Sequence, residues 1–186
     1  MTTYHQNIPD QYLHEPKGVV TAVDGAVYVA DGLGSGNWVA KEAYVNGFIP
    51  FDAVTPAYQH SVTTLFTALN PTFSLEATKN FVGVASPTSG LKYTGCEDIV
   101  ASFHFSFNFK NASGGTAHLE VSFYRNGTPM NGGHAIITAQ PNVWRQGTLS
   151  DLVTVSQNDL IEVMVKSDVA FDLDIAGGSL IVVGEA

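Results

Sequence analysis

The chain has 186 residues, enough for one domain or at most two, and a formal net charge of −9. Only 13% of its residues are charged, against about 25% in a typical soluble domain. That shortage excludes a long amphipathic helix or coiled coil, whose outer faces need charge. Eleven Phe among 45% hydrophobic residues exclude a disordered chain. Eight basic residues without a cluster exclude binding to nucleic acid or to an anionic membrane.

The N-terminus has neither the basic start nor the apolar core of a signal peptide. No apolar run approaches the roughly 20 residues that span a bilayer. Cys96 is the only cysteine, so it cannot close an intrachain disulfide. We therefore expect a protein that is made and assembled in a cytoplasm.

The first part of the chain divides into two short regions. Residues 1–17 are polar, contain two prolines and show no period, which predicts an extended arm. Residues 18–57 contain short β-type runs broken by glycine, and we expect a small hairpin and linker module. The Asp24-Gly25 pair between residues 19–23 and 26–30 is typical of a two-residue hairpin turn.

Residues 58–186 read as strand after strand. In residues 99–109 apolar side chains at odd positions alternate with Ser, His and Asn, which predicts a half-buried strand with an aromatic face. Residues 62–69 have partly helical spacing, but their β-branched residues favour a strand. The run at 180–183 is apolar throughout, as in a strand buried on both faces. About eight such strands predict an all-β fold, an antiparallel jelly-roll β-sandwich.

The residues offer no catalytic constellation. Serines, histidines and one cysteine are present, but no local signature joins a nucleophile to a base, so we expect no enzyme activity. Cys96 is interpreted as a small, partly buried apolar residue. The glycine run at 32–36 lacks the lysine of a phosphate-binding loop. We assign no catalytic, cofactor-binding or metal-ligating residue and expect no cofactor.

Two arrangements leave a metal site open as an alternative. A cross-strand pairing of His104 with His118 would offer two imidazoles to a metal in a trimer, whereas the other interpretation is two surface or interface histidines. Asp172 and Asp174 would share a strand face and offer oxygens to Ca²⁺. A solvated acidic face is the simpler interpretation, because the loop lacks the residue order of a calcium loop.

Three segments near the N-terminus resemble a module that recurs in structural proteins of tailed bacteriophages. They are His14–Gly18, Val27–Gly32 and Gly34–Trp38. In head-fibre, decoration and tail-associated proteins this module stands ahead of a trimeric β domain.

Residues 58–186 are similar to the C1q/TNF-like jelly rolls found on phage particles, which leaves residues 39–57 unassigned. The matching pieces are Leu91–Gly95, the aromatic strand, Phe123–Pro129 and Leu149–Val163. Asn158 stands where that family usually has glycine, a mild departure because Asn also tolerates a positive φ.

The resemblance implies a bacteriophage virion structural protein, namely a homotrimeric capsid decoration or head-fibre protein. Its arm would bind the major capsid protein and its jelly-roll knob would project, stabilising the head or aiding adhesion to a host receptor or glycan. It implies location on the capsid surface after synthesis in the bacterial cytoplasm. The residues that we expect to anchor the arm are Tyr4, Tyr12, Leu13, His14 and Pro16.

The aromatic strand also suggests how copies would meet. Its polar face carries no charge, so we expect trimer contacts there, at Ser102, His104, Ser106 and Asn108. The alternative function is a receptor- or glycan-binding tip of a phage tail fibre, in which Trp144 and Tyr124 would stack on sugars. Trp144 also fits the role of a packing residue at a strand edge.

Overall fold

The computed structural model describes residues 26–30, 36–40, 42–49, 56, 58–71, 74–84 and 90–185. The chain divides into two compact units, Met1–Lys41 and Glu42–Ala186. The described residues form strands and their connections, which confirms the predicted all-β class. None of them belongs to a helix able to cross a membrane.

In the first unit, β1 (Ala26–Ala30) pairs antiparallel with β2 (Gly36–Ala40), with Ala26 opposite Ala40. Residues 26–30 are therefore a strand, as expected. The predicted partner at 19–23 and its Asp24-Gly25 turn lie outside the described residues, as does the arm of residues 1–17.

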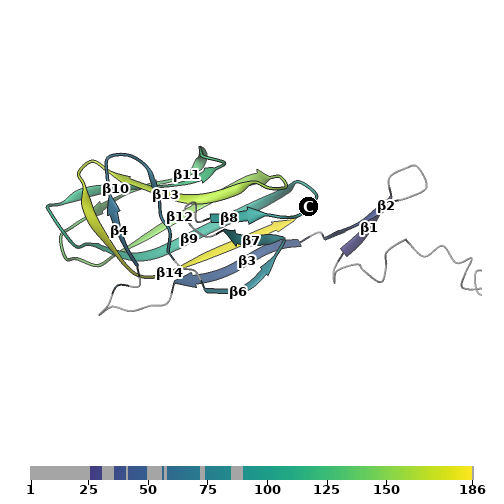
Figure 1. The fold of residues 1–186 in the computed structure, drawn as a ribbon, viewed down its shortest axis with the longest axis horizontal. Coiled ribbons are helices and arrows are strands. Elements are labelled where there is room, and N and C mark those ends of the chain that lie inside the picture. The colour runs from purple at the N-terminus through teal and green to yellow at the C-terminus, as the bar shows by residue number, and fades with distance from the viewer. Residues whose placement is uncertain are drawn as a thin grey trace, which may run out of the picture. The chain divides into compact units, whose positions relative to one another are not determined.

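The second unit is a sandwich of two antiparallel sheets (Figure 1). The first, named here the β9 sheet, has the order β12-β9-β14-β3-β6, with β4 also on β14. Its strands are β12 (Arg145–Val155), β9 (Ile99–Asn111), β14 (Phe171–Glu185), β3 (Glu42–Ile49), β6 (Ser74–Lys79) and β4 (Tyr58–Val62).

The second sheet, named the β10 sheet, has the order β11-β10-β13-β8-β7, with β5 also on β13. Its strands are β11 (Thr128–Ala139), β10 (Ala117–Arg125), β13 (Leu160–Ser167), β8 (Gly90–Tyr93), β7 (Phe81–Val84) and β5 (Thr67–Ala68). The chain crosses repeatedly between the two sheets, for example from β9 to β10 and from β11 through β12 and β13 to β14. The predicted jelly-roll sandwich is thus confirmed, with more strands than the eight expected.

Residues 42–49 belong to the sandwich, although the sequence grouped them with the linker module. They form β3, which pairs with β14. Glu42 lies opposite Glu185 at one end of this pairing, and Ile49 lies opposite Gly178 at the other. Strand β4 continues along the same edge of β14, where Tyr58 lies opposite Ile175. The sandwich therefore begins at Glu42 rather than at residue 58.

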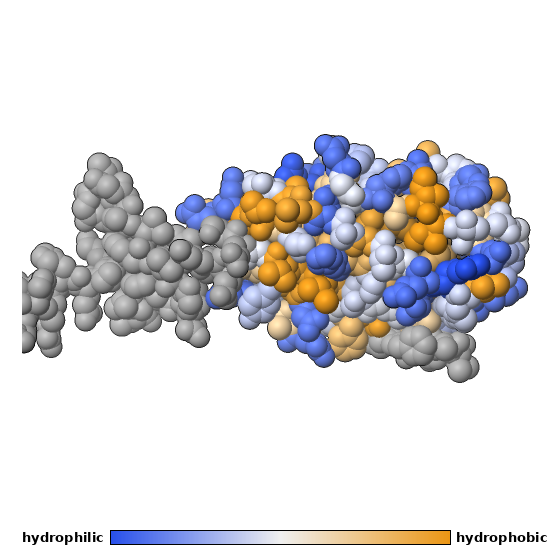
Figure 2. All heavy atoms as spheres, turned by 180° about the vertical axis from the view of Figure 1, so that it is seen from behind, coloured by the Kyte–Doolittle hydropathy of each residue, from blue (hydrophilic) through white to orange (hydrophobic). Residues whose placement is uncertain are grey.

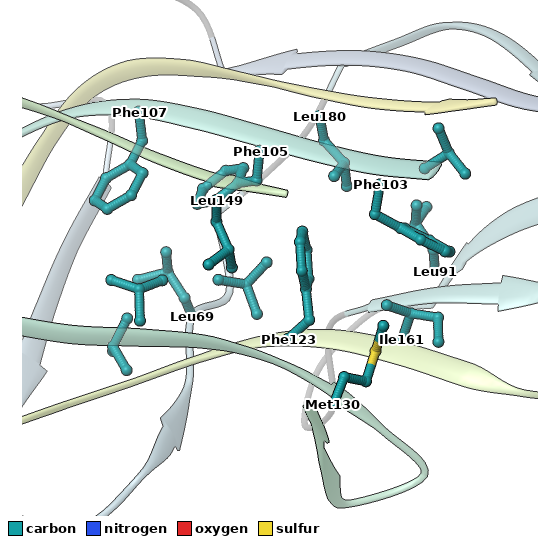
Figure 3. Packing of buried hydrophobic residues seen from close by; sticks show 14 of the residues in the cluster. Leu69, Leu91, Phe103, Phe105, Phe107, Phe123, Met130, Leu149, Ile161 and Leu180 are labelled. Atoms are coloured by element: carbon teal, nitrogen blue, oxygen red, sulfur yellow. The ribbon is translucent and has the colours of Figure 1, made fainter. Parts of the chain in front are cut away.

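The aromatic strand forms the centre of the core. The odd positions of β9 point inward, and Phe103, Phe105, Phe107 and Phe109 are at most 1% exposed. Figure 3 shows the first three of these side chains pointing from the β9 sheet toward Phe123 of the opposite sheet. The predicted half-buried strand and its aromatic inner face are thus confirmed.

The rings pack edge to face and offset across the sandwich. The ring centroid of Phe103 lies 5.9 Å from that of Phe123 and 6.1 Å from that of Phe81. The planes of the Phe103 and Phe81 rings meet at 87°. Phe105 and Phe107 stack at 5.0 Å on their own strand face. Such pairs add about 0.5–1.5 kcal/mol each beyond the area they bury.

The terminal strand departs from its expectation. Leu180 and Val182 point into the core, but Ile181 is 42% and Val183 is 55% exposed. Within one protomer this strand is therefore buried on one face only, because its other face lies on the outside of the β9 sheet.

The segment at 62–69 is two strands with a break between them. β4 ends at Val62 and β5 holds Thr67 and Ala68. His60 bridges them: its Nε2 lies 2.8 Å from the Thr67 hydroxyl and its Nδ1 lies 3.1 Å from the Tyr58 hydroxyl. Burial lowers the pKa of His60 below its ordinary value of 6.5.

Two turns follow the predicted chemistry. Asn126 and Gly127 have φ of 52° and 77°, as a two-residue turn with two positive φ angles requires. Asn158 has φ of 73°, a left-handed conformation that Asn tolerates.

Replacing Phe103 by Ala should lower the free energy of unfolding by about 3–5 kcal/mol, because it leaves a cavity between Phe81 and Phe123. Chemical denaturation measures this. The matched control is Ile136→Ala at a 64% exposed position, which should change the unfolding free energy by about 0.5 kcal/mol or less. Equal effects of the two variants would contradict the assignment of the core.

His60 should make the protein less stable at acidic pH. Its folded pKa lies below 6.5, so between the two values the unfolded chain binds more protons, and the free energy of unfolding falls as pH drops through this window. His60→Gln should remove that part of the loss. Denaturation curves of both proteins between about pH 8 and pH 5 check this. If the difference in unfolding free energy between the wild type and His60→Gln stays the same across that pH range, the prediction is wrong.

Candidate assembly surface

The middle of the outer face of strands β12, β9, β14 and β3 carries no formal charge. On the same face Lys110 and Asp174 lie at one end, and the registers place Glu42 and Glu185 at the other. The registers place on it Gln146, Thr148, Ser150, Leu152 and Thr154 of β12, Val100, Ser102, His104, Ser106 and Asn108 of β9, Ser179, Ile181 and Val183 of β14, and Tyr44, Asn46 and Phe48 of β3. These side chains are polar but neutral, or apolar. We name this surface the neutral face.

Apolar side chains gather at one end of the neutral face. Ser102 of β9 lies between Leu152 of β12 and Val183 of β14, and Val100 is next to it on the same face. Leu152 is 67% exposed and Val100 is 52% exposed. Figure 2 shows that the view from behind carries hydrophobic patches among hydrophilic ones. Exposed apolar side chains that adjoin one another in this way are typical of protein contact sites.

His104 lies near the centre of the neutral face. Its Nε2 is 2.8 Å from the Ser102 hydroxyl, and Ser106 and Ser179 share a hydrogen bond of 2.9 Å beside it. A shallow depression of about 280 Å³ opens between β12, β9 and β14, lined in part by His104 and Ile181. The polar groups here satisfy one another along the strands, so this surface can be covered without a buried charge.

The outer face of the β10 sheet is different. Glu120 accepts from Lys166 at 3.0 Å and lies 2.9 Å from His134. The Lys166 ammonium also lies 4.5 Å from the Phe66 ring centroid. These charges are paired with one another across neighbouring strands, as on a face that meets solvent.

An exposed ion pair lies at the end of this charged face. The backbone N–H of His118 donates to Asp168 at 2.7 Å, and its Nδ1 lies 2.7 Å from the other carboxylate oxygen. The backbone hydrogen bond first and the imidazole contact second lower the pKa of Asp168 from 3.8 to about 2.

The acidic residues of β14 are held by protein groups. Asp174 is buried and accepts from Gln59 at 2.8 Å, with the Lys110 ammonium at 3.3 Å. Asp172 accepts from the Ser61 hydroxyl at 2.9 Å. The two aspartates do share a strand face, but these contacts attach β4 and β9 to β14. The part of the chain that the structure describes contains no group of three or more His, Cys, Asp or Glu suited to a metal ion.

The structure corrects three of the sequence interpretations. His104 and His118 cannot pair across strands, because β9 and β10 lie in opposite sheets. Tyr124 is 8% exposed and packs on Phe66, so its ring is not available to stack on a sugar. Cys96 is exposed rather than partly buried.

The remaining candidate residues fall in two places. Trp144 is half-buried, with the Lys110 ammonium 5.0 Å from its ring centroid, which agrees with a packing role at a strand edge. Ser102, His104, Ser106 and Asn108 all lie on the neutral face. The arm residues Tyr4, Tyr12, Leu13, His14 and Pro16 lie outside the described residues.

Sequence reasoning missed the apolar part of the neutral face. Val183 and Leu152 come next to Ser102 only through the strand registers, which join residues far apart in the chain. One signal was present: the uninterrupted apolar run at 180–183 is unexpected for a strand with one wet face.

No family model and no curated protein matches the sequence. Among solved structures, the chain is similar to the vertex protein P5 of PRD1, with a TM-score of 0.46 and 11% identity over 77% of this chain and 96% of that one. Murine APRIL at pH 5.0 matches with a TM-score of 0.45 and 10% identity over 78% and 100% of the two chains. Eiger TNF from S. frugiperda matches with a TM-score of 0.44 and 5% identity over 77% and 93%.

Proposed function

We propose that the protein is a bacteriophage virion structural protein, a homotrimeric capsid decoration or head-fibre protein. Its N-terminal region binds the major capsid protein, and its jelly-roll knob projects from the head, which it stabilises or helps to attach to a host receptor or glycan. The observation that carries the proposal is the neutral face, because exposed Leu152, Val183 and Ile181 lie on it beside the uncharged outer positions 102–108 of β9.

Of the two outer faces of the sandwich, only the neutral face favours a contact between copies. A contact through the β10 sheet would have to dehydrate the ion pairs of Glu120 with His134 and Lys166, at a cost of several kcal/mol per ion. A contact through the neutral face covers apolar side chains and neutral hydroxyls. In this proposal Ser102, His104, Ser106 and Asn108 lie against other copies.

Within this contact, we expect the apolar run at 180–183 to contribute most of the stabilisation. Each residue of this run is apolar, yet Ile181 and Val183 are exposed in one protomer. A second copy on the neutral face would bury both, at about 25 cal/mol for each Å² of apolar surface removed from water. The strand would then be buried on both faces, as its composition predicts.

The location on the particle rests on the N-terminal segments that resemble a phage module, His14–Gly18, Val27–Gly32 and Gly34–Trp38. The arm of residues 1–17 is polar, and such segments bind by laying their backbone along a partner. The protein is then made in the bacterial cytoplasm and resides on the capsid surface.

A lysine on the neutral face should dissociate the trimer. Ile181→Lys places a charge in an apolar contact, whereas the matched control Ile136→Lys lies on the charged outer face opposite Glu120. By light scattering, the wild type and the control should have three times the protomer mass of 19.8 kDa. Ile181→Lys should have the mass of a single protomer.

Either of two results would contradict this contact. A wild-type chain of 19.8 kDa at micromolar concentration would rule out the trimer. Ile181→Lys that still forms trimers would move the contact away from the neutral face. Circular dichroism of each variant shows whether the strands are retained.

Removing residues 1–17 should abolish binding to capsids and leave the protein trimeric, because the neutral face lies in the second unit. Co-sedimentation with purified heads measures binding of the full and shortened chains. Binding that survives the deletion would place the anchor in residues 18–57. High-resolution imaging of intact particles tests the location: knobs on the head support the proposal, and knobs only on the tail favour the tail-fibre alternative.

A further inference from the structure

The chain contains three Asn-Gly pairs, Asn46-Gly47, Asn126-Gly127 and Asn131-Gly132. In such a pair the asparagine carboxamide can react with the backbone nitrogen of the following residue, and glycine has no side chain to hinder the approach. The reaction needs freedom of both groups to reach one another. The three pairs differ in the hydrogen bonds and strand pairing that surround them.

Asn126 is held on all sides. Its Nδ2 donates to Asp159 Oδ1 at 2.6 Å, and its Oδ1 accepts from the backbone N–H of Leu160 at 2.9 Å. Its own backbone N–H donates to the Leu160 carbonyl at 2.9 Å. The carboxamide is therefore fixed to the connection between β12 and β13 and cannot turn toward Gly127.

Asn46 lies inside a ladder. β3 is paired on both sides, and Gly47 lies opposite Leu180 of β14 and Leu75 of β6. The register with β6 shifts between Asn46 and Gly47, but the pairing with β14 is regular there. The Asn46 side chain donates to Glu76 Oε2 at 3.1 Å. Reaction here would require β3 to separate from its neighbours.

Asn131 lies where the ladder of β11 is interrupted. Ser122 pairs with His134 and Tyr124 pairs with Pro129, so Met130 to Gly133 face Phe123 alone. Asn131 and Gly132 are both exposed. Among the residues that the structure describes, none forms a hydrogen bond with the Asn131 side chain.

The two glycines after Asn131 lie against neighbouring side chains. A Cβ at position 132 would lie 2.3 Å from Asp151 Oδ1, so the Asp151 side chain would have to turn away. A Cβ at 133 would lie 2.6 Å from the ring of Phe123, which is buried in the core. The close approach of β11 to the core therefore favours small residues here.

We propose that Asn131 is a site of spontaneous deamidation in the folded protein. The backbone nitrogen of Gly132 attacks Cγ of Asn131 and forms a C–N bond, while the bond from Cγ to Nδ2 breaks. The proton of the Gly132 N–H passes through solvent to the departing Nδ2, which leaves as ammonia. Water then opens the cyclic imide at either carbonyl and gives aspartate or isoaspartate.

The product changes the cavity beside it. Asn131 and Asp151 line the same space of about 280 Å³, together with Arg125 and Leu152. Arg125 donates to the Thr154 carbonyl at 2.6 Å. A new carboxylate would share this cavity with Asp151, of like charge, and with Arg125, of opposite charge.

The test is incubation of the full chain at mildly alkaline pH and physiological temperature, followed by peptide mapping by mass spectrometry and an isoaspartate assay. Conversion at Asn131 should run at least about tenfold faster than at Asn126 or Asn46. In a denatured chain the three rates should become similar. Asn131→Gln should remove most of the isoaspartate.

A matched variant tests the reason for the difference. Asp159→Ala removes the acceptor of Asn126 Nδ2 and should speed conversion at Asn126 while leaving Asn131 unchanged. The proposal is overturned if Asn126 or Asn46 converts as fast as Asn131 in the folded chain. It is equally overturned if the ranking is the same in the denatured chain, because the fold would then not decide it.

Discussion

β9 and β14 pair along most of their length, with Val100 opposite Glu185 at one end and Asn111 opposite Leu173 at the other. β12, β3 and β4 each pair with one of these two strands, and β6 pairs with β3. The same ladder sets which side chains face inward. The odd positions of β9 bring their Phe rings against the β10 sheet, so a slip by one residue would expose all of them. The pairing of β9 with β14 therefore determines both which side chains form the core and which form the neutral face.

This coupling gives the low charge content a physical cause. Paired charges lie on the β10 sheet, where Glu120 is paired with Lys166, and at the β4 end of the β9 sheet, where Asp174 is paired with Lys110. The centre of the β9 sheet has an aromatic inside and an uncharged outside. A shortage of charge that looked like a global property is thus local, and it lies over the strands proposed to meet other copies.

The sequence predicted what depends on local patterns and missed what depends on register. The period of two identified β9 and its inner Phe side chains, and the Asn126-Gly127 turn followed from backbone preference. It could not show that β9 and β10 lie in opposite sheets, which separates His104 from His118. Tyr124 looked like a surface aromatic because its burial depends on Phe66, which is distant in sequence.

Strands β3 and β4 share one edge of β14 and follow one another along it in chain order, with Ile49 opposite Gly178 and Tyr58 opposite Ile175. Both ends of the connection are therefore fixed at neighbouring positions, whatever its length. Doubling a loop of this kind costs only about 0.6 kcal/mol in closure entropy. The sheet can thus accept a foreign peptide between residues 50 and 57 without a change of register, which makes this edge a natural place to graft an epitope.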